Sequence, residues 1–287
     1  MRRSISSRLL PVVVVLTLAM APAFAQSLNW YGQTGALSTP LAYVTSSPAN
    51  SIGAPTVAFH MSNAGDVLGF QSQFSITAGA FQRMEFGFSH TLSSENTLGG
   101  GLFQNDFFSF HVKVNLLREN FHKKLLPAIS VGFIEQPDIR RAADATTHAD
   151  SNAANVYVVA TKTITRIPQL PIVLSGGVKG TNAVLFGLGG VANHYEARGF
   201  GTAAIVVKTP FKTKAIFGAE ADQQPTELKN LPGVSIPTEL TYFARVLPMP
   251  EKPINLDFGV AQFAGKVAPG LDLKARSQFC FAISYRL

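Results

Sequence analysis

The sequence predicts an all-β fold: an antiparallel transmembrane β-barrel of about twelve strands that follows a cleaved signal peptide. Three observations predict it. The chain begins with an export signal, continues with segments in which apolar residues alternate with small or polar ones, and ends on a segment with the same alternation. After the signal, no apolar stretch approaches the roughly 18 residues expected of a membrane-spanning helix.

The N-terminus has the three parts of a secretory signal peptide. Three arginines precede a short apolar run, which leads to the small-residue site Ala23-Phe24-Ala25. The run is shorter than the roughly 20 residues of a membrane helix, which favours cleavage after Ala25 over an uncleaved anchor. The next segment is rich in Ser, Pro, Gly and Asn and is predicted to be a mobile or plug-like lead-in. The predicted organisation is signal peptide 1–25, lead-in 26–54 and barrel 55–287.

Twelve segments of alternating polarity follow the lead-in, as expected for strands with one face toward lipid and one toward the lumen. They are 55–62, 68–76, 80–91, 106–117, 125–134, 153–164, 171–179, 199–209, 213–221, 235–246, 254–263 and 277–287.

The connections between these segments alternate in length, as in bacterial barrels with long extracellular loops and short periplasmic turns. The long ones are 92–105, 135–152, 180–198, 222–234 and 264–276; the first connection, 63–67, is the exception. An even strand count with this order predicts that both termini lie in the periplasm, with the barrel in the outer membrane of a Gram-negative bacterium.

The alternation also assigns polar residues to the lumen, because side chains two apart on a strand share a face. The predicted lumen-lining candidates are His60, Ser62, Arg83, Glu85, His111, Lys113, Lys214, Glu220, Glu239, Arg245 and Asp257. Their charges are of both signs. They would form either an ion-pair network that blocks the bore or the lining of a narrow wet path.

The last strand, Phe279–Leu287, has a large apolar residue at every odd position. It resembles the C-terminal signal read by the barrel assembly machinery, although it ends in Leu287 where Phe or Trp is usual. The alternative is the last strand of a soluble β-sandwich. A barrel implies outer-membrane lipid and lipopolysaccharide as partners of its outer face.

His60 and Ser62 lie two residues apart on a predicted strand, so an imidazole could activate a hydroxyl on the same face. The string His60-Met61-Ser62-Asn63 resembles the His-x-Ser-Asn motif of lipid A 3-O-deacylases, which are small outer-membrane barrels. That family has the motif near the end of the chain with an acidic partner downstream, where this chain has Phe74. The residues are better explained as lumen polar groups, and no catalytic residue is predicted.

Other chemistry is not indicated by the sequence. The six histidines show no metal-ligand spacing, and neither a metal nor a cofactor is predicted. The formal net charge is +7, without a basic stripe or nucleic-acid-binding motif, so a nucleic-acid partner is not expected.

One further resemblance concerns the lead-in. The stretch Gly32-Gln-Thr34-Gly35-Ala-Leu-Ser-Thr39-Pro40-Leu-Ala42 is similar to the Gly-x-Thr-Gly…Pro-x-Ala signature of YjbH-type outer-membrane proteins. The stretches 126–132 and 156–162 are similar in style. The resemblance implies an outer-membrane barrel linked to exopolysaccharide production, with polysaccharide or export proteins as partners, and no catalytic residue.

Three functions are therefore considered. The first is a non-enzymatic barrel that assists export or surface attachment of an envelope polysaccharide. The second is a passive, porin-like channel for small solutes, and the third is a lipid A-modifying enzyme. A periplasm-facing soluble β-protein is the fourth alternative.

Overall fold

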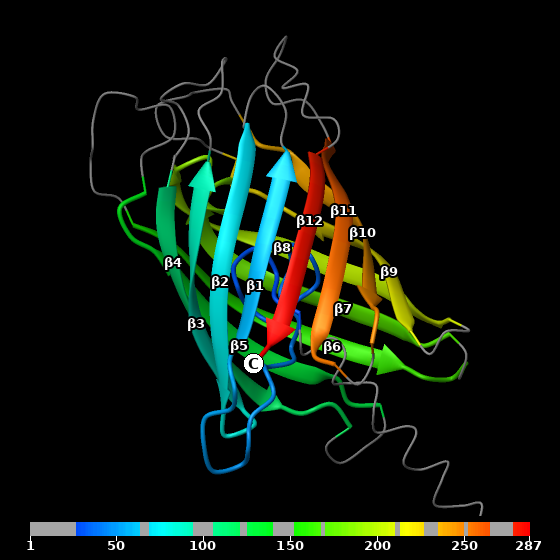
Figure 1. Cartoon of the computed structure of the whole chain (residues 1–287). Coiled ribbons are helices and arrows are strands. Elements are labelled where there is room, and N and C mark those ends of the chain that lie inside the picture. The colour runs from blue at the N-terminus through cyan, green and yellow to red at the C-terminus, as the bar shows by residue number, and fades with distance from the viewer. Residues whose placement is uncertain are drawn as a thin grey trace, which may run out of the picture.

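The chain forms a closed barrel of twelve antiparallel strands, in which β12 pairs with β1 (Figure 1). The computed structural model describes residues 27–63, 69–93, 106–120, 125–139, 152–167, 170–209, 213–226, 235–249, 252–264 and 278–287. The strands are β1 Thr56–Asn63, β2 Phe70–Ala80, β3 Met84–Ser93, β4 Asp106–Leu117, β5 Ala128–Gln136, β6 Ala153–Ile164, β7 Ile172–Ala183, β8 Val191–Lys208, β9 Lys214–Asp222, β10 Thr238–Leu247, β11 Ile254–Ala264 and β12 Gln278–Arg286. The predicted fold class is confirmed. The predicted signal peptide lies outside the described residues.

The largest error of the sequence prediction concerns the hairpin of β7 and β8. A long connection was expected over 180–198, but β7 continues to Ala183 and β8 begins at Val191. A short turn joins them, with a 3-10 helix at Leu185–Gly187. Residues 193–197 at the start of β8 are mostly exposed on both faces of the strand. Their polarity therefore does not need to alternate, and the sequence does not predict a strand there.

The outer face of the barrel is apolar. Exposed large apolar side chains lie on strands around the whole circumference, including Phe59, Phe74, Phe86, Phe110, Val158, Val178, Phe217, Tyr242, Phe258 and Phe279. Exposing such a continuous apolar surface to water is unfavourable, whereas the hydrocarbon of a bilayer accommodates it. A closed barrel also pairs every strand edge, as a bilayer requires. The molecule is therefore an outer-membrane-type transmembrane β-barrel.

Separately, no helix in the described part of the chain is long and apolar enough to cross a membrane.

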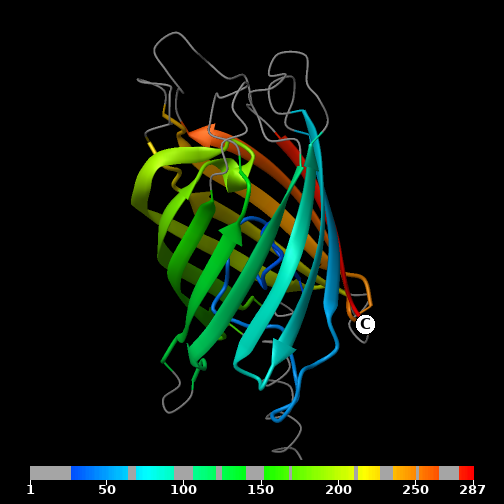
Figure 2. The same ribbon diagram turned by 90° about the vertical axis from the view of Figure 1, so that its left-hand side faces the viewer.

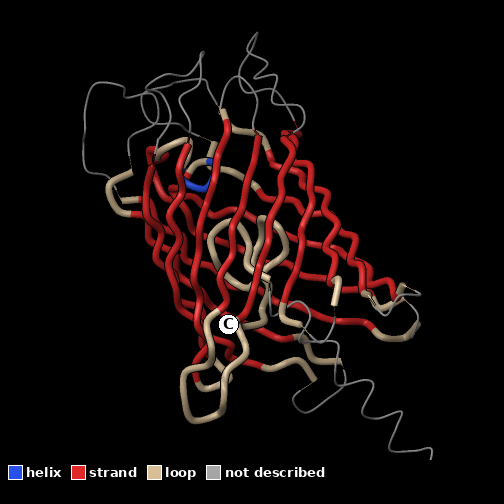
Figure 3. Tube along the Cα trace, viewed as in Figure 1, coloured by secondary structure: helices blue, strands red, loops and turns tan. Residues whose placement is uncertain are grey.

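The two ends of the barrel differ. The end where β1 begins and β12 finishes, at the bottom of Figure 1, is called the near end, and the opposite end is the far end. Connections at the near end include 81–83, 165–171 and 209–213, whereas those at the far end include 94–105, 137–152 and 265–277. Figure 3 shows the strands of the wall and the short 3-10 helix near the far end.

The segment before β1 lies inside the barrel. Residues Ser27–Thr45, called the plug, coil within the lumen in both views (Figures 1 and 2) and are buried except at residues 43 and 44. The chain then leaves at the near end and turns back into β1. The turn Val184–Gly190, called the far-end turn, is buried on the other side of the plug, and its Phe186 ring meets that of Tyr31 at 5.2 Å between centroids.

Candidate functional site: a plug held by buried charges of the wall

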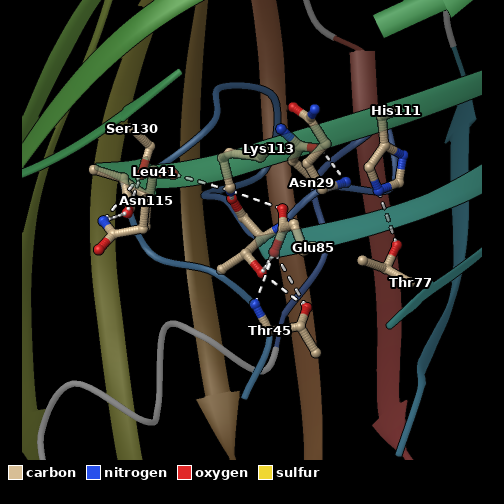
Figure 4. A network of polar contacts seen from close by, with 12 residues as sticks. Asn29, Leu41, Thr45, Thr77, Glu85, His111, Lys113, Asn115 and Ser130 are labelled. Atoms are coloured by element: carbon tan, nitrogen blue, oxygen red, sulfur yellow. Dashed lines mark hydrogen bonds and ion pairs between the residues drawn. The ribbon is translucent and has the colours of Figure 1, made fainter. Parts of the chain in front are cut away.

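The first contact between wall and plug is an ion pair that binds plug backbone. Glu85 of β3 and Lys113 of β4 are register partners, and Lys113 Nζ lies 2.8 Å from Glu85 Oε1 with both side chains fully buried. Lys113 also donates to the carbonyls of Thr34 and Leu41, at 2.8 and 3.0 Å. Glu85 accepts the backbone N–H groups of Thr34 and Thr45, at 2.9 and 2.8 Å (Figure 4). This group is called the first latch.

The second latch is Glu220 of β9. Its carboxylate accepts three consecutive backbone N–H groups of the plug, from Leu37, Ser38 and Thr39, at 3.0, 3.0 and 2.8 Å. The Thr39 hydroxyl adds a fourth bond at 2.6 Å. Successive N–H groups that converge on one anion form a nest, so the plug backbone supplies the positive potential this carboxylate needs. Among the described residues no cationic side chain forms an ion pair with Glu220.

The third latch is the pair Arg245 of β10 and Asp257 of β11, which are register partners 2.6 Å apart between Nε and Oδ1. The two terminal nitrogens of Arg245 donate to the carbonyls of Gly35 and Ala36, each at 3.1 Å. The hydroxyl of Ser27 donates to Asp257 at 2.7 Å. The fixed fork of the guanidinium suits this grip on two neighbouring carbonyls.

Uncharged wall residues complete the contact. His60 Nε2 bonds the carbonyl of Leu28 at 3.0 Å, and Thr77 bonds that of Gly32 at 2.5 Å. Asn115 and Ser130 both donate to the carbonyl of Ala42, and His111 lies 3.2 Å from the Thr77 hydroxyl (Figure 4). The wall thus binds the plug mainly through the plug's backbone.

Glycine makes room where wall and plug backbone meet. A Cβ on Gly79 of β2 would lie 1.9 Å from the carbonyl oxygen of Thr45, so a side chain there would displace the end of the plug. Within the plug, Gly32 has φ +81°, a left-handed conformation that costs glycine little.

Most of the predicted lumen residues lie on the inner face. His60, Ser62, Glu85, His111, Lys113, Glu220, Glu239, Arg245 and Asp257 are all buried inside the barrel. Lys214 is half-buried at the first position of β9.

The placement predicted for Arg83 is wrong. Arg83 lies in the turn between β2 and β3, where its guanidinium donates to the carbonyls of Asn115 and Leu116 at the near end. The strand begins one residue later, at Met84, and the alternation of faces does not extend into a tight turn.

Sequence reasoning missed two buried groups. Lys179 of β7 and Asp222 of β9 form an ion pair of 2.6 Å on the inner face. β7 is too uniformly apolar to assign faces, and Asp222 was placed in a connection. Continuing the parity of Glu220 by two residues would have identified Asp222.

The His60 and Ser62 pair does not form a nucleophile and base. Ser62 Oγ lies 3.4 Å from Cys280 Sγ, and His60 is bonded to the plug. The described residues show no hydrogen bond between the two side chains, which a base-activated hydroxyl requires. Nor does any group of three His, Cys, Asp or Glu in the described ranges have the geometry of a metal site.

Two tyrosines of the plug have raised pKa values. Burial raises the pKa of Tyr31 well above its usual value, and the negative charge of Asp222 adds to the effect. Burial and Glu119 raise the pKa of Tyr43, whose hydroxyl donates to Glu119 at 2.7 Å. Both hydroxyls therefore stay protonated across the physiological range.

A cavity of about 40 Å³ remains between the plug and the far-end turn. The plug contributes Trp30, Leu37 and Ser38 to it, and the far-end turn contributes Leu185, Phe186 and Leu188. The wall contributes Ser62, Gln71, Glu239, Thr241, Ala261, Phe263, Gln278 and Cys280. A smaller cavity lies beside Tyr31 and Asp222.

A family model described as "Protein of unknown function (DUF3034)" matches residues 30–248, which include most of the plug and β1 to β10. The chain belongs to this family. No curated protein matches it.

Solved barrels resemble the chain at low identity. A KdgM porin is 8% identical with a TM-score of 0.46, over 81% of this chain and 99% of that one. The COG4313 outer membrane channel from Pseudomonas putida F1 is 11% identical with a TM-score of 0.45, over 84% and 97%. A Pseudomonas aeruginosa FadL homologue is 11% identical with a TM-score of 0.41, over 93% and 97%. Likenesses this distant add no argument about function.

Proposed function

We propose that this protein is an outer-membrane channel for small solutes whose bore is closed, in the conformation described, by its own plug. The single observation that carries the proposal is that the lumen is filled by a chain segment bound through its backbone to charged wall residues. This favours the channel over the polysaccharide-export role as the main function.

Barrel width supports the proposal. Eight strands leave an interior that wall side chains can fill, and the bore widens with strand number. A twelve-stranded wall therefore encloses space that must hold water, a ligand or a further segment. Here that segment is the plug, which leads into β1 through residues 46–55. We propose cleavage after Ala25, as the sequence predicts; the plug is then joined to the wall at one side only and can leave without any strand separating.

The nature of the contacts also favours a removable plug. Each latch replaces contacts with water by contacts with the wall, so the net stabilisation of each neutral bond is only about 1 kcal/mol, and about 1.5–3 kcal/mol where a charged group takes part. In an open state water would re-solvate both the wall charges and the plug backbone. A lumen closed permanently could be filled with apolar side chains at no such cost.

The orientation follows from the connections. Bacterial barrels have short turns on the periplasmic side and long loops outside, so we assign the near end to the periplasm. The start of β1 and the end of β12 then face the periplasm, and the plug enters the barrel from that side. Protease protection in intact cells tests this assignment.

Breaking the first latch tests the channel. The variant E85Q/K113M keeps the shape of both side chains but removes their charges, so the plug should leave more often. We expect a higher frequency of conducting steps in planar bilayers than for the native protein. The matched control is E196Q/R198M, which removes a half-buried ion pair that is bonded to Thr226 and belongs to none of the three latches.

Heat-modifiable gel mobility shows first that each variant forms the barrel. A folded E85Q/K113M barrel that conducts no more than the native protein contradicts the proposal, as does an equal gain in the control.

A polysaccharide-related role is kept as a second proposal, because the stretch that resembles YjbH-type proteins, Gly32–Ala42, is the stretch the three latches bind. Deleting the gene should then reduce the surface polymer of the cells, and the native gene should restore it. An unchanged amount of polymer would end this proposal and leave the channel untouched.

We propose that the protein is not an enzyme. Lipid A lies in the membrane, whereas His60 and Ser62 face the lumen and His60 is covered by the plug. Expression of the native protein, His60→Ala or Ser62→Ala should leave the lipid A mass spectrum unchanged. We also propose that the assembly machinery reads Phe279–Leu287, most of which forms the strand that closes the barrel against β1.

A further inference from the structure

The cavity between the plug and the far-end turn has a distinctive chemistry. Aromatic rings from three separate parts of the chain border it: Trp30 of the plug, Phe186 of the far-end turn and Phe263 of β11. Glu239 of β10 contributes its one carboxylate. The remaining polar lining is neutral, with hydroxyl and amide groups on β1, β2, β10 and β12.

Glu239 is buried without a cation. Its side chain accepts one hydrogen bond among the described residues, from the Thr241 hydroxyl at 3.1 Å. No described Lys, Arg or His forms an ion pair with it. Buried carboxylates are usually paired with a cation or bonded by several donors, because desolvation of an unpaired charge is costly.

The neighbours of Glu239 increase the negative potential. Asp222 is its register partner on β9, and Glu220 stands opposite Thr241. Lys179 is the one described cation in ion contact with this group, 2.6 Å from Asp222, while Glu220 is bonded by plug N–H groups. Three buried carboxylates therefore share a single ammonium group.

An independent observation comes from the plug. The Ser38 hydroxyl oxygen and the Trp30 indole nitrogen are fully shielded from solvent and have no hydrogen-bond partner among the described residues. Both residues line the cavity. The plug hydroxyl and the Glu239 carboxylate thus line one cavity, and each can accept a hydrogen bond from a donor group.

We propose that this cavity binds a small organic cation, with the ammonium group on Glu239 and the alkyl part against the aromatic rings. A carboxylate compensates the charge, the Ser38 oxygen accepts a second N–H bond, and ring faces attract a cation through their quadrupole. The volume suits a ligand of a few non-hydrogen atoms. The site does not depend on conduction, so it stands apart from the channel proposal.

Trp30 is the chain's only tryptophan, so its fluorescence reports on the cavity directly. The full-length barrel, purified in detergent, is titrated with propylammonium chloride from micromolar to millimolar concentrations. We expect a saturable change in Trp30 emission. 1-Propanol, which matches the ligand in size but is neutral, should give no saturable change, and sodium chloride controls for ionic strength.

Variants separate the site from a general effect. Glu239→Gln keeps the shape and should weaken propylammonium binding at least about tenfold, the loss expected when a buried ion pair cannot form. The matched control Glu196→Gln lies outside the cavity and should bind as the native protein does. A folded native barrel without a saturable response, or an equal response in Glu239→Gln, overturns the proposal.

Discussion

The plug and the far-end turn both fill the lumen and both bury apolar side chains against the wall, but the charged latches bind the plug and not the turn. The plug is held by buried charges and hydrogen bonds to its backbone. The far-end turn packs in an apolar cluster with Phe107, Ile139, Ala153 and Ile236, to which it contributes Val184, Leu185 and Leu188. Polar contacts can be exchanged for water at little net cost, whereas exposing apolar surface is costly. Under the proposed function, the plug is the movable closure and the turn is a fixed part of the wall.

The largest expected effect concerns the third latch, whose charged side chains hold the plug. Arg245→Ala should destabilise the barrel by about 3–5 kcal/mol, because it leaves Asp257 buried without its partner. The third latch also opens, so conduction should rise. Urea unfolding and bilayer conductance measure the two effects, with Arg166→Ala at an exposed position as the control.

The double variant R245M/D257L removes both charges together and should recover most of the lost stability while the bore stays open. If it closes the bore as the native protein does, then the charges of this latch do not hold the plug.

A smaller effect concerns the apolar packing of the far-end turn. Val184→Ala should destabilise by about 2 kcal/mol through lost packing in the far-end cluster, yet leave conduction at the native level because the plug stays in place. The matched control, Val178→Ala, changes an outward-facing valine and should cost much less. An open channel in Val184→Ala would show instead that the far-end turn is the closure.

The smallest effect concerns the end of the plug. Tyr43→Phe removes the hydroxyl bond to Glu119 and should cost about 1 kcal/mol at neutral pH. The folded pKa of Tyr43 is raised by burial and by Glu119, so its stabilisation is complete below the unfolded pKa of about 10 and is lost as the pH rises above it. Unfolding midpoints at pH 8 and 11 should therefore differ more for the native protein than for Tyr43→Phe. Equal shifts would contradict the assignment.

The sequence predicted the wall far better than the filling. A strand that separates lipid from a polar lumen must alternate, so β4 and β6 were predicted with their observed bounds, and Glu85 and Lys113 were assigned to the lumen. The contacts of the plug could not be predicted, because backbone N–H and carbonyl groups carry no sequence signature. The far-end turn was not predicted, because the strands beside it extend past the region of alternating polarity. Arg83 was assigned to the wrong place, because side chains in a turn do not follow the alternation of a strand.

The most direct test of the central claim is the conductance of a barrel that lacks residues 27–45 but retains the wall and the far-end turn. The account predicts long-lived open steps for this barrel and rare, brief ones for the native protein, with both shown to be folded by heat-modifiable mobility. If the deletion prevents folding, E85Q/K113M takes its place in the same measurement. A folded barrel without its plug that stays as closed as the native protein would contradict the account.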